Sequence, residues 1–163
     1  MSYVDTSAIV AALDPLDPRQ RLVKELLEKE PYKVISELVI AELASVITRR
    51  EELVDNIAST LSLRREEAFM AVLLYILKKF NLKYKSIRNS TRMPLIGNMY
   101  KPLAVAIELS HKLKLRTLDL LHTAYVKIMK DEGESIQKLI TVDRDFEKAR
   151  KVFREMGINL HIV

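Results

Sequence analysis

The 163-residue sequence contains no cysteine. This absence excludes disulfide scaffolds, thiolate zinc sites, cysteine nucleophiles and iron–sulfur clusters, and it fits a reducing, cytoplasmic compartment. Long apolar runs are also missing: the longest, Ala68 to Leu77, has ten residues, half of the roughly 20 that span a bilayer. The N-terminus has no basic segment followed by an apolar stretch. We therefore expect neither a membrane span nor a signal peptide.

Acidic residues are absent from residues 68–107. The chain as a whole has 27 basic and 22 acidic residues, and without the seven basic residues of this stretch the balance is 20 against 22. Phe80, Tyr84 and Tyr100 are interleaved with them. Such a surface would follow a phosphate backbone and stack on unpaired bases of single-stranded RNA; the alternative is a solvated, lysine-rich loop. The seven basic residues are Lys78, Lys79, Lys83, Lys85, Arg88, Arg92 and Lys101.

Short apolar segments alternate with amphipathic helices along most of the chain. This alternation predicts a central parallel sheet with helices on both faces, a three-layer α/β/α fold. The length is that of a single domain, residues 1–163. From about residue 53 to 130 the pattern is mostly helical, with an irregular stretch over 81–102. The expected strands are 2–5, 33–35, 138–142 and 158–163, and the expected helices outside that region are 8–13, 18–30, 37–50 and 144–156.

Four carboxylates stand isolated in apolar surroundings. Asp5 and Asp143 each end an apolar strand, so in a parallel sheet both emerge at the carboxyl edge, where open α/β sheets bind ligands. Glu42 and Asp119 are each the only charge in a ten-residue helical segment. If the four converge, the pocket needs protons or divalent cations to offset the charge. Hard oxygen ligands favour Mg²⁺ or Mn²⁺.

Each of these acids also has a purely structural interpretation. Asp5 could cap a helix that starts near Ser7, and Asp143 could cap the last helix. Asp119 could complement a helix dipole. Glu42 lies in the middle of a helix, where it cannot cap the helix N-terminus, so the main structural alternative to a functional role is a salt bridge to an arginine. Taken as a set, two strand ends and two apolar helices that each carry one acid favour a metal site.

Four short motifs spread over the chain surround these acids. They are Tyr-Val-Asp-Thr-Ser at 3–7, Ser-Glu-Leu-Val-Ile-Ala-Glu-Leu at 36–43, Leu-Arg-Thr-Leu-Asp-Leu-Leu-His-Thr-Ala at 115–124 and Thr-Val-Asp-Arg-Asp-Phe at 141–146. Their order and context resemble PIN-domain nucleases, and within that family the compact VapC-type toxins of toxin–antitoxin pairs. The resemblance implies a Mg²⁺- or Mn²⁺-dependent endoribonuclease that hydrolyses phosphodiester bonds of single-stranded or structured RNA. It also implies an antitoxin partner and a homodimer.

The resemblance assigns roles residue by residue. Thr6 or Ser7, together with Thr141, resemble polar residues that support the site. Asp145 matches a frequent additional acid of the metal site. His122 lies three residues after an acid of the quartet and shares its helical face, so it either touches the site or packs and hydrogen-bonds the carboxylate. The catalytic, metal-binding quartet would be Asp5, Glu42, Asp119 and Asp143.

The middle of the chain is longer than the resemblance requires. Glu42 and Asp119 are 77 residues apart, more than the compact toxins usually need, so we expect a helical and basic insertion at about 53–102. Such an element leaves open a housekeeping RNA-processing nuclease, or a non-catalytic PIN-like module that binds RNA or protein. A haloacid-dehalogenase-like phosphatase fits less well, because it needs a second aspartate where Ser7 stands.

Overall fold

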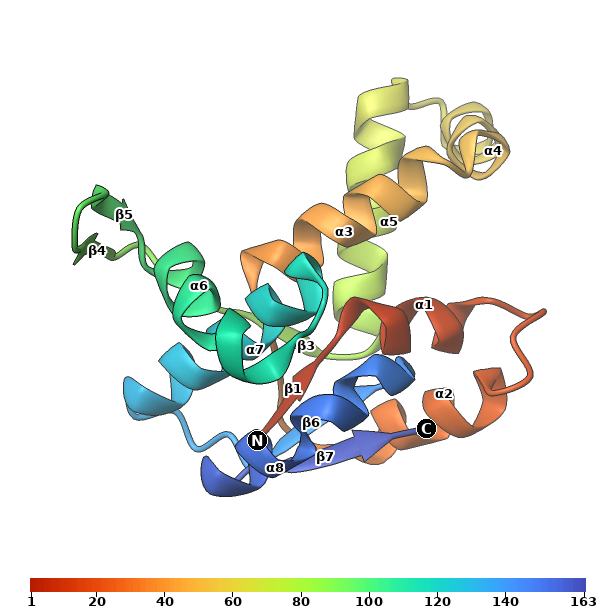
Figure 1. Ribbon diagram of the computed structural model, residues 1–163. Coiled ribbons are helices and arrows are strands. Elements are labelled where there is room, and N and C mark those ends of the chain that lie inside the picture. Colours follow the sequence, from red (N-terminus) through yellow and green to blue (C-terminus); the bar gives the residue numbers. More distant parts are fainter.

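The structure is a computed structural model that describes all 163 residues. Its centre is a five-stranded, fully parallel sheet with the order β3-β2-β1-β6-β7. Helices cover both faces of this sheet (Figure 1), which confirms the expected three-layer α/β/α fold. The strands are β1 (Ser2–Val4), β2 (Lys33–Ile35), β3 (Leu82–Tyr84), β6 (Lys138–Thr141) and β7 (Asn159–Ile162), and a separate hairpin consists of β4 (Ser90–Met93) and β5 (Gly97–Tyr100).

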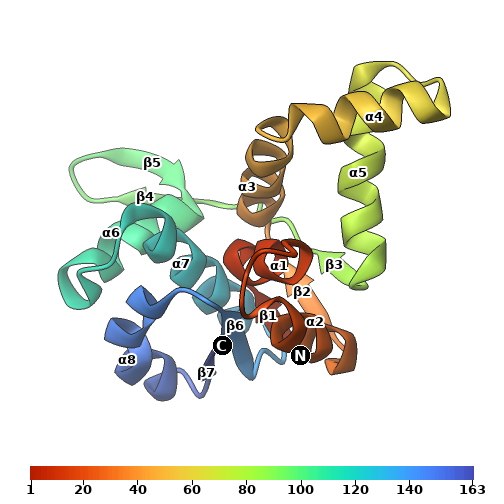
Figure 2. The ribbon, with the colours of Figure 1, turned by 90° about the vertical axis from the view of Figure 1, so that its right-hand side faces the viewer.

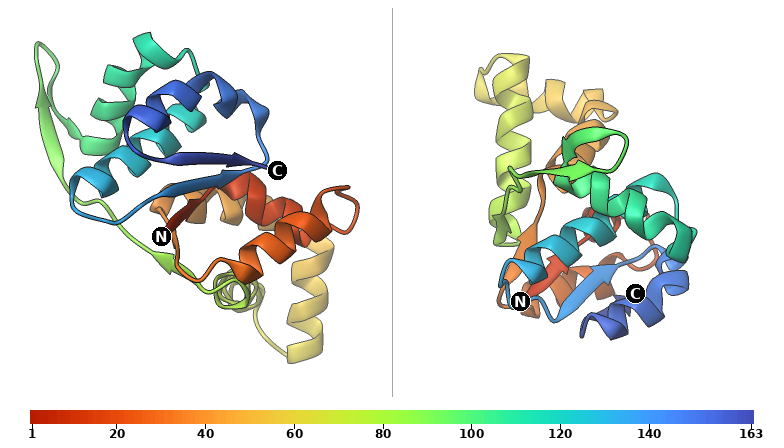
Figure 3. Two further views of the ribbon diagram at one scale, coloured as in Figure 1. Left: turned by 90° about the horizontal axis from the view of Figure 1, so that it is seen from below. Right: turned by 60° about the vertical axis from the view of Figure 1, so that its left-hand side comes forward.

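The helices divide between the two faces according to the direction of the crossovers. Figure 3 shows α1 and α2 on one face and α6, α7 and α8 on the other. Since parallel crossovers are right-handed, reversing the strand order beside β1 moves the later helices to the opposite face. No helix is long and apolar enough to cross a membrane. The helices are α1 (Thr6–Leu13), α2 (Gln20–Lys29), α3 (Glu37–Thr48), α4 (Glu51–Leu61), α5 (Arg65–Lys79), α6 (Lys101–Leu113), α7 (Thr117–Asp131) and α8 (Arg150–Glu155), which follows the 3-10 helix η1 (Arg144–Ala149).

Strand β1 lies at the middle of the sheet, between β2 and β6. Its residue Tyr3 pairs with Val34 on one side and Leu139 on the other, and all three side chains are buried. A strand covered on both faces needs such a continuous apolar run rather than an alternating one. The strand order reverses between β1 and β6, and open α/β sheets bind ligands at the carboxyl ends of strands beside such a reversal.

The stretch expected to be irregular, residues 81–102, contains three strands and is irregular only over 85–89 and in the hairpin turn, so most of that prediction was wrong. β3 pairs in parallel with β2 and buries Leu82, which makes it an edge strand of the central sheet. β4 and β5 form an antiparallel hairpin with two positive φ angles, at Leu95 in the turn (φ 67) and at Gly97, the first residue of β5 (φ 102). Strands of three and four residues are too short to show a clear period in the sequence. Because β3 belongs to the sheet, the region at 53–102 is not wholly an addition to it.

Helices α4 and α5 form an arm that stands away from the sheet (Figures 1 and 2). Val54 is the only buried residue of α4. The apolar run at 68–77 lies in α5, where Val72 and Ile76 join the core whereas Tyr75 stays 58% exposed. The arm therefore leaves apolar surface uncovered on its own chain.

Candidate functional site

The four predicted acids line one pocket of about 640 Å³ at the carboxyl edge of the sheet. Asp5 directly follows β1, and Asp143 comes two residues after the end of β6. Glu42 projects from the middle of α3, and Asp119 from the first turn of α7. The reversal of strand order thus brings together four side chains that are distant in the sequence.

Most of the purely structural interpretations do not describe these acids. Asp5 occupies the N-cap position of α1, but its side chain makes no capping hydrogen bond. Glu42 pairs with His122 rather than with an arginine. Asp119 lies in the first turn of α7, where its charge also suits the helix dipole. Only Asp143 caps, accepting a hydrogen bond of 2.8 Å from the backbone N–H of Asp145.

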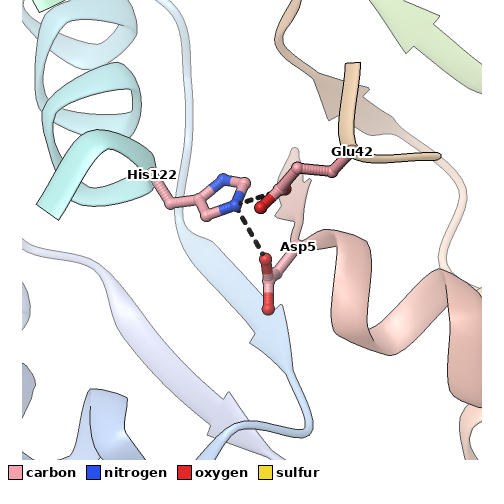
Figure 4. Close-up of side chains that lie close together, drawn as sticks. All are labelled: Asp5, Glu42 and His122. Atoms are coloured by element: carbon pink, nitrogen blue, oxygen red, sulfur yellow. Dashed lines mark hydrogen bonds and ion pairs between the residues drawn. The ribbon is translucent and has the colours of Figure 1, made fainter. Parts of the chain in front are cut away.

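Asp5, Glu42 and His122 form one compact group (Figure 4). The Nε2 atom of His122 lies 3.1 Å from Oδ1 of Asp5 and 2.9 Å from Oε2 of Glu42, and the imidazole is 2% exposed. Burial lowers the pKa of His122, but the hydrogen bond to Glu42 and the charge of Asp5 outweigh it and raise that pKa above its ordinary value. Burial likewise raises the pKa of Glu42, yet hydrogen bonds from His122 and Thr6 hold it below its ordinary value.

Three hydroxyl groups hold the two carboxylates of this group in place. Thr6 Oγ1 donates a hydrogen bond to Oε2 of Glu42. Ser7 Oγ and Thr141 Oγ1 both donate to Oδ2 of Asp5, the latter over 2.7 Å. The sequence left the choice between Thr6 and Ser7 open, and in the structure each serves a different acid.

Two residues behind His122 were not predicted. The hydroxyl of Tyr3 lies 2.9 Å from Nδ1 of His122 and 2.8 Å from Oγ of Ser36, and both residues are fully buried. The sequence does hold a signal for Tyr3: it stands two positions before Asp5, so the strand directs both side chains to the same side. Ser36 follows β2 directly and opens the motif at 36–43, but nothing in the sequence gives its hydroxyl a role at the site.

Asp119, Asp143 and Asp145 form a second acidic group in which one oxygen of each lies within 4.8 Å of the others. Asp119 is only 8% exposed, and its Oδ2 atom is buried without any hydrogen-bond partner. Burial, together with the charges of Asp143 and Asp5, raises the pKa of Asp119 to about 6. A buried acceptor that lacks a donor calls for an explanation, and a cation is one that suits a carboxylate.

The donor set fits the Mg²⁺ or Mn²⁺ that the sequence motifs imply. It comprises five carboxylates and one imidazole, and oxygen-rich sites of this kind select hard divalent cations. The unpaired oxygen of Asp119 is the observation in this structure that supports the fit.

Three arginines line the same pocket, and none of them was predicted: Arg19, Arg49 and Arg116. Arg116 pairs with Asp145 over 3.1 Å while its side chain stays 79% exposed. Arg19 donates a 3.0 Å hydrogen bond to the carbonyl oxygen of Val142. Guanidinium groups bind phosphates through a planar set of donors, so the rim of an acidic pocket also offers sites for an anionic chain.

None of the seven basic residues predicted to bind RNA lines this pocket. Lys85 is paired with Glu134, and Lys101 with Glu132 over 2.8 Å. Both partners follow α7 at its C-terminal end, whereas the acidic site lies at the N-terminal end of that helix. The ammonium of Lys83 lies 5.9 Å from the ring centroid of Tyr32. The other four are Lys78 and Lys79 near the end of α5, Arg88 before the hairpin and Arg92 on β4.

The aromatic residues of the basic stretch correct a further expectation. Phe80 is 1% exposed and lies in the core, so the prediction that it stacks on bases was wrong. The hydroxyl of Tyr100 donates to the carboxylate of Glu37, which holds the base of the hairpin against α3. Burial, together with that hydrogen bond, raises the pKa of Tyr100 to about 12. Only Tyr84, at 51% exposed, retains a face open to a ligand.

Comparisons with known proteins agree with this architecture. VapC20 of Mycobacterium tuberculosis, a toxin that cleaves the sarcin–ricin loop, superposes with a TM-score of 0.59 at 20% identity, over 91% of this chain and 95% of that one. VapBC2 of Rickettsia felis, solved with a promoter DNA fragment, superposes with a TM-score of 0.55 at 18% identity, over 99% and 98%. No curated protein sequence matches the chain.

Because both sequence identities are low, these two structural similarities show a shared fold only. The family comes from the sequence itself, where the model of the PIN domain matches residues 2–152. As that match extends over nearly the whole sequence, the chain belongs to the PIN-domain family.

Proposed function

We propose that this protein is a metal-dependent endoribonuclease that hydrolyses phosphodiester bonds in RNA. The carrying observation is the buried, unpartnered Oδ2 of Asp119, which lines a pocket shared with the other acids of the quartet. Mg²⁺ or Mn²⁺ would be held by Asp5, Glu42, Asp119 and Asp143, with Asp145 as a further oxygen ligand.

A divalent cation bound there would polarise a phosphate oxygen and lower the pKa of an attacking water. The chain's own residues do the positioning. Ser7 and Thr141 fix the orientation of Asp5, and Thr6 fixes that of Glu42. Arg49 and Arg116 stand on the rim of the pocket, where they would anchor phosphates next to the cleaved bond.

The direct test compares two aspartate substitutions on one helix. Asp119→Asn removes a charge in the pocket, whereas Asp131→Asn removes the exposed partner of Lys127 near the other end of α7. A mixed single-stranded RNA is incubated with each purified protein and Mg²⁺, Mn²⁺ or EDTA, and circular dichroism checks the fold. We expect metal-dependent cleavage by the parent and by Asp131→Asn, and none by Asp119→Asn. Cleavage that EDTA leaves unchanged, or that both variants retain, would contradict the proposal.

We further propose that the nuclease is the toxin of a toxin–antitoxin pair. Two of the solved structures that it resembles are a VapC toxin and a VapBC complex. An apolar pocket of about 420 Å³ between α1, α4 and α5 supports a protein partner, since Leu61 and Tyr75 are both more than half exposed there. Exposed apolar surface of this kind is typical of docking sites.

The toxin role makes a prediction about cells. Induced expression of the wild-type chain should arrest bacterial growth, whereas Asp119→Asn, made at the same level, should not. Co-expression of a short upstream reading frame that encodes the antitoxin should restore growth. A protein that cuts RNA in vitro but leaves growth unaffected would instead be an RNA-processing enzyme.

A further inference from the structure

One nitrogen atom faces the carboxylates of the pocket. Nε2 of His122 lies 3.1 Å from Oδ1 of Asp5 and 2.9 Å from Oε2 of Glu42 (Figure 4). Two donors that bind side by side to an octahedral ion, at about 2.1 Å each, are about 3 Å apart. The two distances from Nε2, which are those of an ion pair and a hydrogen bond in this structure, also fit neighbouring ligands of one cation.

The contacts of the imidazole leave Nε2 as the ring nitrogen that faces the pocket. Nδ1 of His122 lies 2.9 Å from the hydroxyl of Tyr3, which lies 2.8 Å from Oγ of Ser36. In this structure Nε2 is hydrogen-bonded to Glu42. If a cation took the place of the Nε2 proton, Nδ1–H would donate to Tyr3 and Tyr3 to Ser36, and the Nε2 lone pair would face the cation between the two carboxylates. Metal-binding histidines in proteins almost always donate their other ring N–H to an oxygen acceptor, most often a carboxylate, a backbone carbonyl or water, and here the hydroxyl of Tyr3 would take that place. All three residues are at least 98% buried, so this orientation is rigid.

A second observation points independently to a cation in the same pocket, beside this group. Asp119 lies one helical turn before His122 on α7, and both line the same pocket. The Oδ2 atom of Asp119 is buried and has no donor within the protein. Asp119 as a residue is 8% exposed, and its carboxylate lies in a region that already holds the charges of Asp5 and Asp143.

We propose that His122 is a direct metal ligand through Nε2, in a site that it shares with Asp5 and Glu42. This inference rests on the proposed function, because it deepens the description of the same centre. Two subsites of different chemistry then lie side by side: one with a nitrogen and two carboxylates, and an all-oxygen one composed of Asp119, Asp143 and Asp145.

The two subsites should differ in the metal that they prefer. Carboxylates and water suit both Mg²⁺ and Mn²⁺, but Mn²⁺, a transition-metal ion, accepts an imidazole nitrogen more readily than the harder Mg²⁺ does. Binding through His122 therefore favours Mn²⁺ over Mg²⁺ in the first subsite. The all-oxygen group gives no such advantage to Mn²⁺. We expect the ratio of Mg²⁺ to Mn²⁺ dissociation constants to fall when the nitrogen is removed.

Pulsed electron paramagnetic resonance tests the ligand directly on the intact protein. Samples with one and two equivalents of Mn²⁺ should show coupling to a ¹⁴N nucleus, which changes to the ¹⁵N pattern when only histidine is ¹⁵N-labelled. The chain has two other histidines, so His111→Gln and His161→Gln are matched controls that should retain the coupling. Loss of the coupling in His122→Gln is the expected result. Bound Mn²⁺ without nitrogen coupling would overturn the inference.

A second variant tests the site without removing the imidazole. Tyr3→Phe leaves the imidazole of His122 in place but removes the hydroxyl that contacts its Nδ1. Loss of a group that hydrogen-bonds a metal-binding histidine typically weakens metal binding by about 10- to 100-fold. Tyr125→Phe is the control, because its hydroxyl bonds to Tyr100 rather than to the site. Calorimetry should give an Mn²⁺ dissociation constant at least about tenfold higher for Tyr3→Phe and unchanged for Tyr125→Phe. Equal values for the two variants would overturn the inference.

The measurements separate this inference from the proposed nuclease. Suppose that RNA cleavage depends on Asp119 but that the bound Mn²⁺ shows no nitrogen coupling. His122 is then not a metal ligand, whereas the proposed nuclease activity stands. Nitrogen coupling that disappears in His122→Gln, in a protein that cuts no RNA, supports the ligand and removes the nuclease. A protein that binds no Mn²⁺ overturns both.

Discussion

Folding brings the residues of the acidic pocket together, whereas it spreads the basic residues of the stretch at 68–107 over several elements. The acids are scattered through the sequence and converge in one pocket. The basic residues are close together in the sequence and end up on α5, β3, the segment between β3 and the hairpin, the hairpin itself and α6. Two of them, Lys85 and Lys101, are paired with glutamates of their own chain.

The difference lies in what holds each set in place. Asp5 and Asp143 follow buried strands, and Asp119 sits one turn before a buried histidine, so the core determines where these side chains lie. The core does not constrain solvated lysines in this way. Basic residues that are neighbours in the sequence form one surface patch only if they lie on the same face of one element. Convergence of buried, isolated charges is therefore better evidence for a site than local charge density.

The largest expected effect contrasts Glu42→Gln with Lys101→Gln. Glu42 belongs to the candidate metal centre, and metal polarisation supplies several kcal/mol of transition-state stabilisation, so its loss should lower the cleavage rate by about 100-fold or more. Lys101 is engaged with Glu132 and should change the rate less than about twofold. Initial rates on a labelled RNA measure both. Similar rates for the two variants would remove the contrast between the regions.

A second effect concerns stability and its dependence on pH. The pKa of Asp119 is raised to about 6 in the folded protein, so the folded state binds the proton more tightly than the unfolded state. Ionisation therefore lowers the free energy of unfolding as the pH rises from about 4 to about 6. With EDTA present, Asp119→Asn should be more stable than the parent at pH 7.5 by on the order of 2 kcal/mol. Most of this gain should vanish at pH 3.5.

Urea titrations of both proteins at the two pH values measure this effect. Asp131→Asn is the control, because its carboxylate is exposed and pairs with Lys127 on the surface. A gain of equal size at pH 3.5 would show that the effect does not come from ionisation of Asp119. A loss of stability at pH 7.5 would show that its charge is well compensated within the protein.

RNA binding offers a third contrast, between the rim of the pocket and the basic stretch. Arg49 and Arg116 line the pocket, whereas Lys78 and Lys79 end α5. Each phosphate contact on single-stranded nucleic acid contributes about 0.7 to the slope of log affinity against log salt. In an Asp119→Asn background, replacing both arginines by glutamine should reduce the slope by about 1.4.

Fluorescence anisotropy between 50 and 200 mM salt, the range over which such slopes are visible, measures this change. The matched variant replaces Lys78 and Lys79 by glutamine, and we expect a smaller reduction. An equal reduction for the two pairs would mean that bound RNA extends from the pocket onto α5, as the charge of the basic stretch had suggested.

Much of the fold could be predicted from the sequence because apolar strand segments and amphipathic helices alternate in a recognisable order along the chain. Alternating apolar segments and helices predicted the parallel sheet and its three layers, and both are confirmed. β3 was missed because its three residues include two exposed positions, Lys83 and Tyr84, and so show no apolar run. The hairpin was missed because most of its residues are exposed or half buried, which leaves its strands without the alternation of a core-facing sheet.

The candidate site was predictable only as far as its charges. Asp5, Glu42 and Asp119 stand out because an acid amid apolar residues is costly to bury and needs a reason. Tyr3 and Ser36 do not stand out, because a buried tyrosine and a serine after a strand are ordinary residues until tertiary contacts bring them to His122. Roles that depend on a partner from a different element leave little trace in a single sequence.

The smallest expected effect tests whether Lys101 belongs to the fold or to a binding surface. Its ammonium lies 2.8 Å from Glu132, and both side chains are 29% exposed. Pairs this accessible to water contribute little, so Lys101→Gln should lower the free energy of unfolding by less than about 1 kcal/mol. Urea titration measures it, and Glu132→Gln with the double variant completes a cycle. If Lys101→Gln lowers RNA affinity and the cycle shows no coupling energy between Lys101 and Glu132, the lysine contributes to RNA binding. If the cycle shows a coupling energy and RNA affinity is unchanged, the lysine instead stabilises the contact between α6 and the segment that follows α7.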